Sequence, residues 1–188
     1  MVGSIGTLGV FSFHVTKCLT TGEGGLVVSQ ERRLLEKMRK LRDGGNLLHS
    51  RVPSPMTDLQ AALGMSQLSR YPAFLKRRRL IAERYFEALS DCPVALPDAV
   101  RNESIFFRFP IRVSGKFGVI RKRFAEKGVH VRQGVDALLH RFMNQPPKKF
   151  LNAEHLFSET ISLPIYPTLT EEEQKTVIQA CREVWETR

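Results

Sequence analysis

Hydrophobic positions in the first third of the chain form two short strand-like runs and one helical stripe. The two runs are residues 8–13, LGVFSF, and residues 25–29, GLVVS, and they predict a strand–loop–strand unit. A helix is predicted next, capped by Ser29 and stopped by Gly44–Gly45. The apolar stripe of this helix consists of Leu34, Leu35, Met38 and Leu41.

Two further helical patterns follow a predicted loop at residues 46–56. Thr57 and Gln60 form a capping box, in which the hydroxyl and the amide each satisfy a backbone N–H group of the first turn. The helix after this box is predicted to turn four side chains inward: Leu59, Ala62, Leu63 and Leu68. Pro72 then predicts a kink or a break. The second helix carries five residues at helical spacing: Phe74, Arg78, Ile81, Tyr85 and Leu89.

The chain changes character after residues 90–99, SDCPVALPDA, and the remainder predicts a small α/β lobe. Strands are predicted at residues 105–113, from residue 128 onward and within residues 158–167. Pro110 lies inside the first of these strands and therefore marks an edge strand or a bulge.

Two amphipathic helices complete this lobe. The first spans residues 116–127 and has the stripe Phe117, Ile120 and Phe124. The second starts at a capping box made by Thr170 and Glu173. Its stripe consists of Val177, Ile178, Cys181, Val184 and Trp185. The predicted fold class is therefore α/β: two strands with helices, a helical connector, and then a small α/β lobe.

Composition adds that the chain is of the soluble globular class. Of its 188 residues, 42% are hydrophobic and 26% are charged, which is ordinary for this class. The length is enough for one domain or for two small lobes. No apolar run is long enough to span a membrane and no signal peptide is present, so a cytoplasmic protein without a membrane partner is expected. Cys18, Cys92 and Cys181 match no disulfide framework and no zinc pattern, and the five histidines have no metal-ligand spacing. Free thiols and no metal site are predicted.

The formal net charge of +10 raises nucleic acid as a partner. The densest basic run is KRRR at residues 76–79, and a second is RKRF at residues 121–124. Aromatic residues are not interleaved with these runs as they are in single-strand binders. A solvated helix face is therefore predicted, and nucleic acid is not an expected partner. Part of the charge also suits a small substrate that carries phosphate.

The segment SFHVTKCLTTGEGG, residues 12–25, places one lysine, Lys17, between an aromatic stretch and a turn. A nucleophilic lysine needs apolar or electropositive surroundings. Phe11, Phe13 and Val15 are predicted to supply an apolar wall, and Ser12 offers a hydroxyl for a phosphate. The glycine-rich turn is either a cradle for an anion or a plain turn. A Schiff-base lysine and an ordinary loop lysine both remain open from these residues.

The segment GVFSFHVTKCLTTGEGGLVVS resembles the active-site segment of the DegT/DnrJ/StrS-type sugar aminotransferases, which are pyridoxal-phosphate (PLP) enzymes. The resemblance continues through MTDLQAALGMSQL, RRRLIAERYFEAL and SETISLPIYPTLTEEEQKTVIQACREV, in family order. It implies the carboxyl-terminal portion of the aspartate-aminotransferase-like fold, fold type I, beginning just before the Schiff-base lysine. The division it implies has three parts: residues 1–56 as a remnant of the large PLP-binding domain with the lysine loop, 57–91 as connecting helices, and 92–188 as a small C-terminal α/β domain.

The resemblance also implies roles for two residues. The lysine matching Lys17 forms the covalent link with PLP, and the serine matching Ser12 hydrogen-bonds the cofactor phosphate. Since a dehydratase branch has histidine at the lysine position, Lys17 implies transamination. The implied reaction moves an amino group from an amino acid such as glutamate to a nucleotide-linked keto-sugar, as in polysaccharide biosynthesis. The implied assembly is a homodimer, or an association with the missing amino-terminal half.

Two departures from the family pattern bear on function. Family members are roughly twice as long as this chain, which is a usual length for an enzyme with two lobes. The acidic residue that pairs with the pyridine nitrogen of PLP belongs to the half that this chain lacks. The loop RVPSPMTD has Pro53 and Pro55 where many members have a stretch that reaches the partner's cofactor phosphate, and Arg51 or Ser54 would have to stand in. The alternative function is therefore a truncated, catalytically incompetent fragment that acts as an interaction module or has no activity.

Overall fold

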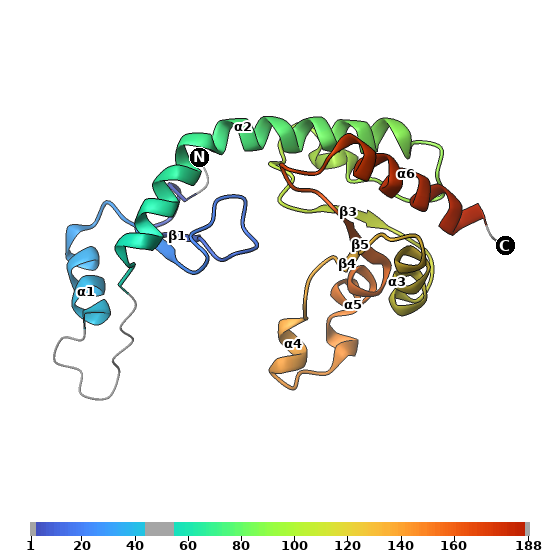
Figure 1. The fold of residues 1–188 in the computed structure, drawn as a ribbon. Coiled ribbons are helices and arrows are strands. Elements are labelled where there is room, and N and C mark those ends of the chain that lie inside the picture. Colours follow the sequence, from blue (N-terminus) through green and yellow to red (C-terminus); the bar gives the residue numbers. More distant parts are fainter. Residues whose placement is uncertain (1–2, 44–54, 187–188) are drawn as a thin grey trace. The chain divides into compact units, whose positions relative to one another are not determined.

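The computed structural model describes residues 3–43 and 55–186, and their contacts divide the chain into two units, Met1–Ala73 and Phe74–Arg188. The division falls inside the long helix α2, Asp58–Ala88 (Figure 1). The boundaries predicted at residues 57 and 92 stay a prediction, because they follow the family resemblance and not the contacts.

The first unit contains an antiparallel hairpin, as the sequence predicts. Strand β1, Gly9–Ser12, pairs with strand β2, Gly25–Val28, in a register that runs from Gly9 opposite Val28 to Ser12 opposite Gly25. All four residues of β2 are exposed, and Val10 in β1 is 75% exposed. The hairpin therefore forms through its backbone ladder without burying either face within this unit.

Helix α1, Arg32–Arg42, follows the hairpin, and the prediction of Ser29 as its cap is wrong. The hydroxyl of Ser29 donates to the carbonyl of Thr7 at 2.8 Å and accepts from the N–H of Glu31 at 3.0 Å. Glu31 is the residue at the cap position, and it makes no side-chain capping bond. Ser29 thus closes the turn before the helix. The predicted stop at Gly44–Gly45 lies outside the described residues.

Helix α2 begins at the predicted capping box and continues through Pro72 without the predicted break. The N–H of Thr57 donates to Gln60 Oε1 at 2.9 Å, and the N–H of Gln60 donates to Thr57 Oγ1 at 3.3 Å. Pro72 is exposed, so water can satisfy the carbonyl that its missing N–H leaves over. The prediction that Leu59, Ala62, Leu63 and Leu68 point inward is wrong, since all four are exposed.

The second unit is built on a three-stranded antiparallel sheet in the order β3-β5-β4. The strands are β3, Phe109–Arg112; β4, Arg132–Gln133; and β5, Thr160–Leu163. Pro110 lies on the edge strand β3, as predicted, where its lack of an N–H costs no ladder bond. Strand β3 is shorter than the predicted run 105–113, because Phe106 has a left-handed φ of 48° and leaves the extended conformation.

Helices α3, Phe117–Glu126, and α6, Glu171–Glu186, confirm the two predicted amphipathic helices. The second capping box is also present: the N–H of Thr170 donates to Glu173 Oε2 at 2.8 Å, and the N–H of Glu173 donates to Thr170 Oγ1 at 3.1 Å. The sequence did not predict two short helices, α4, Leu139–Phe142, and α5, Leu151–Glu159. Two 3-10 turns, η1, Asp98–Val100, and η2, Pro147–Lys149, complete the unit.

The core of the second unit joins its sheet to α3, α6 and the second half of α2, which lies alongside α6 (Figure 1). Its fully buried large side chains include Ile81, Tyr85, Leu89, Phe106, Phe109, Ile111, Phe124, Ile161, Leu163, Leu169 and Val184. Gln174 in α6 donates to the carbonyl of Ile81 in α2 at 2.7 Å and fixes the two helices at this level.

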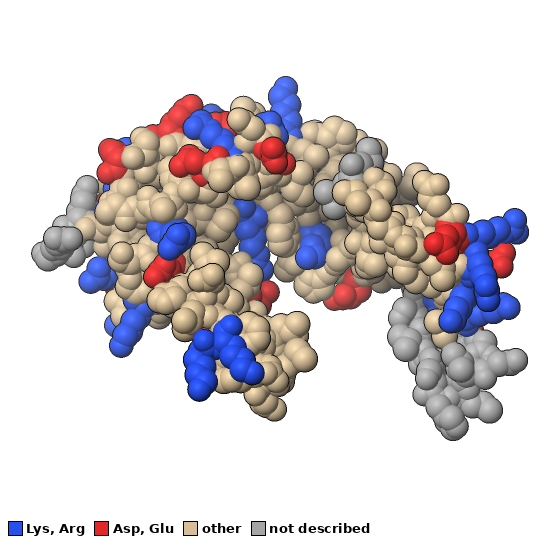
Figure 2. Space-filling model, turned by 180° about the vertical axis from the view of Figure 1, so that it is seen from behind, with Lys and Arg blue, Asp and Glu red and all other residues tan. Residues whose placement is uncertain are grey.

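The basic run at residues 76–79 is only in part the solvated helix face that the sequence predicted, since Lys76 and Arg79 are exposed and the two residues between them are not. Arg78 is buried, and its Nη1 donates to the carbonyls of Ile165 at 2.9 Å and Phe106 at 3.0 Å. Arg77 donates to the carbonyl of Leu169 at 2.7 Å. Figure 2 shows the basic side chains of one face in separate groups among acidic ones. Much of this charge therefore ties α2 to the rest of its unit.

Candidate active site

The loop between β1 and β2 is tied back onto its own strands. Beyond the last ladder pair, the N–H of Phe13 donates to the carbonyl of Gly24 at 2.8 Å, and the N–H of Thr21 donates to the carbonyl of Phe13 at 3.0 Å. The hydroxyl of Thr20 donates to the same Phe13 carbonyl at 3.1 Å. These bonds close the loop at its base, and the closed part carries Lys17.

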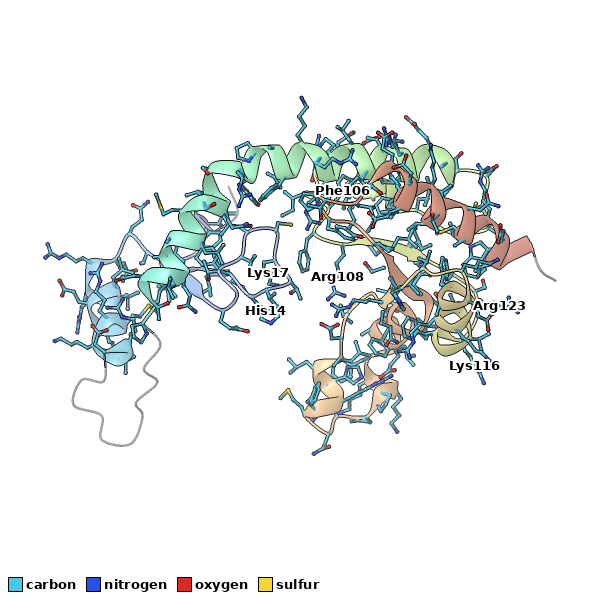
Figure 3. The ribbon with its side chains drawn as sticks, in the orientation of Figure 1. His14, Lys17, Phe106, Arg108, Lys116 and Arg123 are labelled. Atoms are coloured by element: carbon cyan, nitrogen blue, oxygen red, sulfur yellow. The ribbon has the colours of Figure 1, made fainter. Side chains whose placement is uncertain are left out.

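Lys17 lies in a tight turn of this loop and is half-buried (Figure 3). Its N–H donates to the carbonyl of His14 at 2.9 Å. The imidazole of His14 is held from both sides: Nδ1 lies 3.0 Å from the hydroxyl of Thr16, and Nε2 lies 3.7 Å from Glu23 Oε1. The backbone position of the lysine is therefore fixed by its own local sequence.

The TTGEGG segment behind the lysine is a turn that uses its own polar groups. The hydroxyl of Thr20 accepts from the N–H of Gly22 at 2.9 Å, and the hydroxyl of Thr21 donates to the carbonyl of Glu23 at 2.7 Å. Gly22 and Gly24 have φ values of +81° and +153°, which side-chain-bearing residues rarely adopt. A Cβ at Gly24 would lie 2.5 Å from Thr21 Oγ1. Because the N–H groups of Thr21 and Gly22 are already paired, the plain turn is the better interpretation there.

The first turns of α2 contact this loop and hold it in place. Gln60 of the capping box has a second role, since its Nε2 donates to the carbonyl of Glu23 at 3.1 Å. Thr21 is 4% exposed, and its methyl group lies against Gly64, where a Cβ would approach it to 3.0 Å. The sequence showed the capping box but not these two contacts. Gly64 inside a helical pattern was the available signal, because glycine there permits close approach of another segment.

The two predicted site residues lie on this one loop. Ser12 ends β1 and is exposed, and its hydroxyl accepts from the N–H of His14 at 3.3 Å. The turn that starts at His14 then carries Lys17. Phe11 is 37% exposed and Val15 is 62% exposed, while Phe13 is half-buried. The apolar wall that these three residues were predicted to supply to the lysine stays a prediction.

The loop's donor set fits part of PLP. A primary amine, Lys17, suits its aldehyde, and an exposed hydroxyl, Ser12, suits its phosphate. The carboxylate within residues 13–24 is that of Glu23, and it is paired with His14. The loop therefore supplies groups for two ends of the cofactor, and a carboxylate for the ring nitrogen has to come from another segment.

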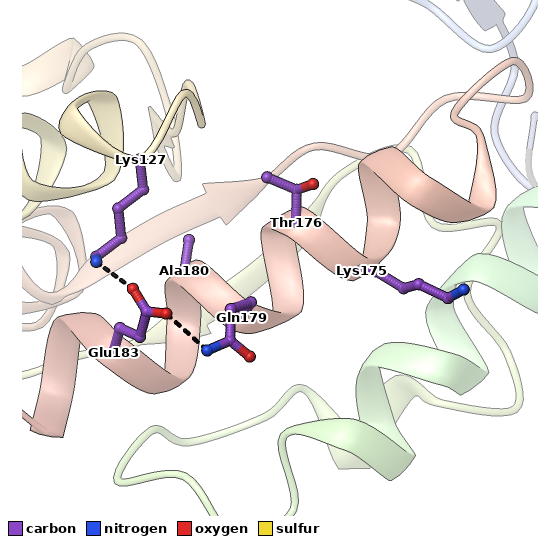
Figure 4. A pocket seen from close by; sticks show the side chains of 6 residues that line it. All are labelled: Lys127, Lys175, Thr176, Gln179, Ala180 and Glu183. Atoms are coloured by element: carbon purple, nitrogen blue, oxygen red, sulfur yellow. Dashed lines mark hydrogen bonds and ion pairs between the residues drawn. The ribbon is translucent and has the colours of Figure 1, made fainter.

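A hollow of ≈ 520 Å³ in the second unit is lined by two lysines, Lys175 on α6 and Lys127 at the end of α3 (Figure 4). Lys127 forms an ion pair with Glu183, and Gln179 Nε2 donates to Glu183 Oε1 at 2.6 Å. The Glu183 carboxylate offsets the cationic charge at this point. One of the two lysines is therefore already paired with a carboxylate, which makes it less available to a phosphate.

Across residues 3–43 and 55–186, no three histidine, cysteine, aspartate or glutamate side chains gather closely enough to hold a metal ion. None of the helices in these same ranges has the length and apolar character needed to cross a bilayer. No disulfide joins Cys18, Cys92 and Cys181, all of which are described.

Comparison with known proteins identifies the relatives of this chain. Residues 1–182 match the model of the DegT/DnrJ/EryC1/StrS aminotransferase family. The spore coat polysaccharide biosynthesis protein SpsC of Bacillus subtilis is 30% identical over 98% of this chain and 55% of its own length. The UDP-4-amino-4,6-dideoxy-N-acetyl-beta-L-altrosamine transaminase of Helicobacter pylori is 30% identical over 98% of this chain and 54% of its own length.

The fold agrees with these relatives. A Streptococcus pneumoniae relative solved in its PLP form is 25% identical and has a TM-score of 0.86, over 98% of this chain and 53% of that one. The chain thus spans about half the length of the curated relatives it matches. The match includes the hairpin, the lysine loop and the second unit, and the chain belongs to the DegT/DnrJ/EryC1/StrS aminotransferase family.

Proposed function

We propose that this chain supplies the lysine-bearing part of a PLP-dependent aminotransferase. The reaction transfers an amino group from an amino acid such as glutamate to a nucleotide-linked keto-sugar. The observation that carries this proposal is the loop that fixes Lys17 in a tight turn beside the Ser12 hydroxyl. The transaminase name of the Helicobacter pylori relative supports the nucleotide-sugar substrate class.

Each loop residue has a role in this proposal. Lys17 would hold the cofactor covalently through its amine, and its Nζ would hold and move a proton during transfer. Ser12 donates a hydrogen bond from its hydroxyl to the cofactor phosphate. His14 positions the turn, because Thr16 and Glu23 hold its ring while its carbonyl accepts from the Lys17 N–H. PLP, when bound, supplies the electron sink for this chemistry.

The rest of the site comes from segments beyond this loop. One hydrogen bond to a charged group contributes only about 1.5–3 kcal/mol, too little to hold a cofactor in an open site. The proposal therefore includes a partner, either the family's amino-terminal half or a second copy in a homodimer. The exposed apolar side chains of the first unit support it: Ile5, Leu8, Val10, Leu26, Leu59, Leu63, Met65 and Leu68. Apolar surface of this kind is usually covered by association. A cytoplasmic location is part of the same proposal.

Light scattering tests the association. We expect a mass above that of one 188-residue chain, rising with concentration, because the first unit leaves its apolar side chains in water. Substituting Val10 and Leu26 by serine should shift the population toward the single chain. A single-chain mass at every concentration would contradict the homodimer and leave the amino-terminal half as the proposed partner.

An activity assay tests the function. The chain is mixed with the family's amino-terminal half, PLP, glutamate and a UDP-linked keto-sugar, and the amino-sugar product is measured. We expect no turnover from the chain alone, turnover with the added half, and its loss in Lys17→Ala. Lys40→Ala, an exposed lysine on α1, is the matched control and should keep the activity.

Two outcomes would contradict the proposal. Turnover by the Lys17→Ala variant would remove the role of the lysine. A failure to gain any activity or PLP absorbance with the added half would favour the alternative function, an interaction module without catalysis.

A further inference from the structure

Two of the three cysteines belong to segments that pack together in the second unit. Cys92 follows the end of α2, in a turn where its N–H donates to the carbonyl of Leu89 at 3.1 Å and the N–H of Val94 donates to its own carbonyl at 2.7 Å. Cys181 lies in the middle of α6 and is fully buried. Cys92 is half-buried and packs against the hydrophobic core that contains Cys181.

Contacts next to the two cysteines hold these segments together. Arg182, the residue after Cys181, donates from Nη2 to the carbonyl of Ala88 at 2.9 Å. The same Nη2 lies 3.6 Å from Asp91 Oδ1, one residue before Cys92. The end of α2 and the middle of α6 are therefore fixed against each other on the sequence neighbours of both thiols.

Cys92 lies against the face of α6 that carries Cys181. Cys92 and Trp185 line one surface hollow of ≈ 180 Å³ with Asp91, Pro93 and Arg182. Trp185 follows Cys181 by four residues, so their side chains lie on the same helix face one turn apart. Cys92 and Trp185 both pack against the core that contains Cys181, and the hollow gives a small reagent access to Cys92.

The electrostatics agree with this closeness. Burial and, less strongly, the charge of the neighbouring Cys92 sulfur together raise the pKa of the Cys181 thiol to about 12. Cys181 is therefore protonated at neutral pH, and the accessible Cys92 is the thiol that reacts first.

We propose that Cys92 and Cys181 form an oxidisable dithiol pair that closes to a disulfide with a small-molecule disulfide such as oxidised glutathione. The Cys92 thiolate attacks one sulfur of the reagent, forms a mixed disulfide and releases one thiolate. Cys181 then loses its proton to water, attacks the Cys92 sulfur and releases the second thiolate. Both cysteines are oxidised, the reagent is reduced to two thiols, and the protein loses two hydrogens.

This disulfide would stabilise the second unit. It would join the end of α2 to α6, and the loop it closes contains the whole sheet with α3, α4 and α5. Such a long closed loop restricts the unfolded chain, so oxidation should raise the unfolding temperature.

Mass spectrometry of the full chain tests the proposal. The folded protein is incubated with oxidised glutathione at neutral pH, acid-quenched, alkylated and digested without reduction. We expect a product lacking two hydrogens, a linked peptide pair containing Cys92 and Cys181, and an unfolding temperature several degrees higher by Trp185 fluorescence. The Cys18→Ser variant should give the same product, because it removes only the third thiol.

Cys92→Ser is the decisive variant, since the half-buried position tolerates a hydroxyl. It should yield neither the linked pair nor the rise in unfolding temperature. The proposal is overturned if glutathione stays attached to Cys92 in Cys18→Ser while Cys181 remains a thiol, or if the linked pair contains Cys18.

Discussion

The two units of the chain handle their apolar side chains in opposite ways. In the second unit, 21 hydrophobic residues are buried in one cluster that joins α2, the sheet, α3 and α6. In the described part of the first unit, Cys18 is the one hydrophobic residue counted as buried, while Val10, Leu26 and Leu59 lie in water. The hairpin and the capping box of the first unit are nonetheless well formed. Local hydrogen bonds are thus enough to form a hairpin or to start a helix, but apolar side chains are buried only where another segment packs against them.

This contrast bears on the place that we propose for the chemistry. Lys17 and Ser12 belong to the unit whose apolar surface has no cover in this chain. A site for a covalent cofactor needs water excluded, because every electrostatic contact weakens in water. The unit that carries the proposed PLP lysine is therefore the one that we expect to depend on a partner.

The contrast between the two units is tested most strongly by truncating one apolar side chain in the sheet of each unit. Phe109→Ala in β3 removes a ring that is 0% exposed and should cost the second unit about 3–5 kcal/mol. Leu26→Ala in β2 removes a side chain that is 48% exposed and should cost less than about 0.5 kcal/mol. Hydrogen exchange of the amides in the two sheets measures both. Equal costs would show that the first unit has a core of its own.

A smaller loss of unfolding free energy is expected when Arg78 is replaced. This variant tests whether buried polar contacts, and not only apolar packing, stabilise the second unit. The buried guanidinium of Arg78 serves the carbonyls of Phe106 and Ile165, and Arg78→Met would leave both unsatisfied at a cost of about 1–3 kcal/mol. Arg79→Met is the matched control, because Arg79 is exposed and donates only to the carbonyl of Asn102 at 3.3 Å. Urea unfolding followed by Trp185 fluorescence compares them. Similar midpoints for the two variants would show that the buried contacts contribute nothing specific.

The smallest effect concerns α4 and α5, which expose apolar side chains although they belong to the second unit. Hydrogen bonds from the Arg141 guanidinium and, less strongly, from His140 hold the pKa of Glu154 at about 2. A lowered carboxyl pKa stabilises the fold above the ordinary pKa near 4.5, and this contribution is lost as the pH falls toward about 2. Glu154→Gln should flatten that part of the profile of unfolding temperature against pH. Glu172→Gln on α6 should leave it unchanged, and an equal flattening in both would contradict the assignment.

The sequence predicted elements well where both partners of a contact lie in this chain. The stripe of α6 is buried at Val177, Cys181 and Val184 because the sheet and α2 supply the other surface. The stripe at Leu59 and Leu63 has the same periodicity, yet it is exposed. A hydrophobic period shows which face seeks burial, and it does not show which chain provides the cover.

Hydrogen bonds between residues close in sequence were also predictable, and contacts between distant segments were not. Both capping boxes follow from residues three positions apart, and the Lys17 turn follows from its own threonines and glycines. Helices α4 and α5 were missed because they are short and leave most of their apolar residues in water, so no period marks them. The contacts of Gln60 and Gly64 with the lysine loop join segments about forty residues apart, which no local pattern encodes.

The central claim is that Lys17 is the residue that binds PLP covalently. The most direct test is to add PLP to the chain together with the family's amino-terminal half, reduce with borohydride, digest and locate the cofactor by mass spectrometry. The account predicts one modified peptide, containing Lys17, and its loss in Lys17→Ala but not in Lys37→Ala on α1. Label on Lys37 or Lys40 in place of Lys17, or label spread evenly over the lysines, would contradict it.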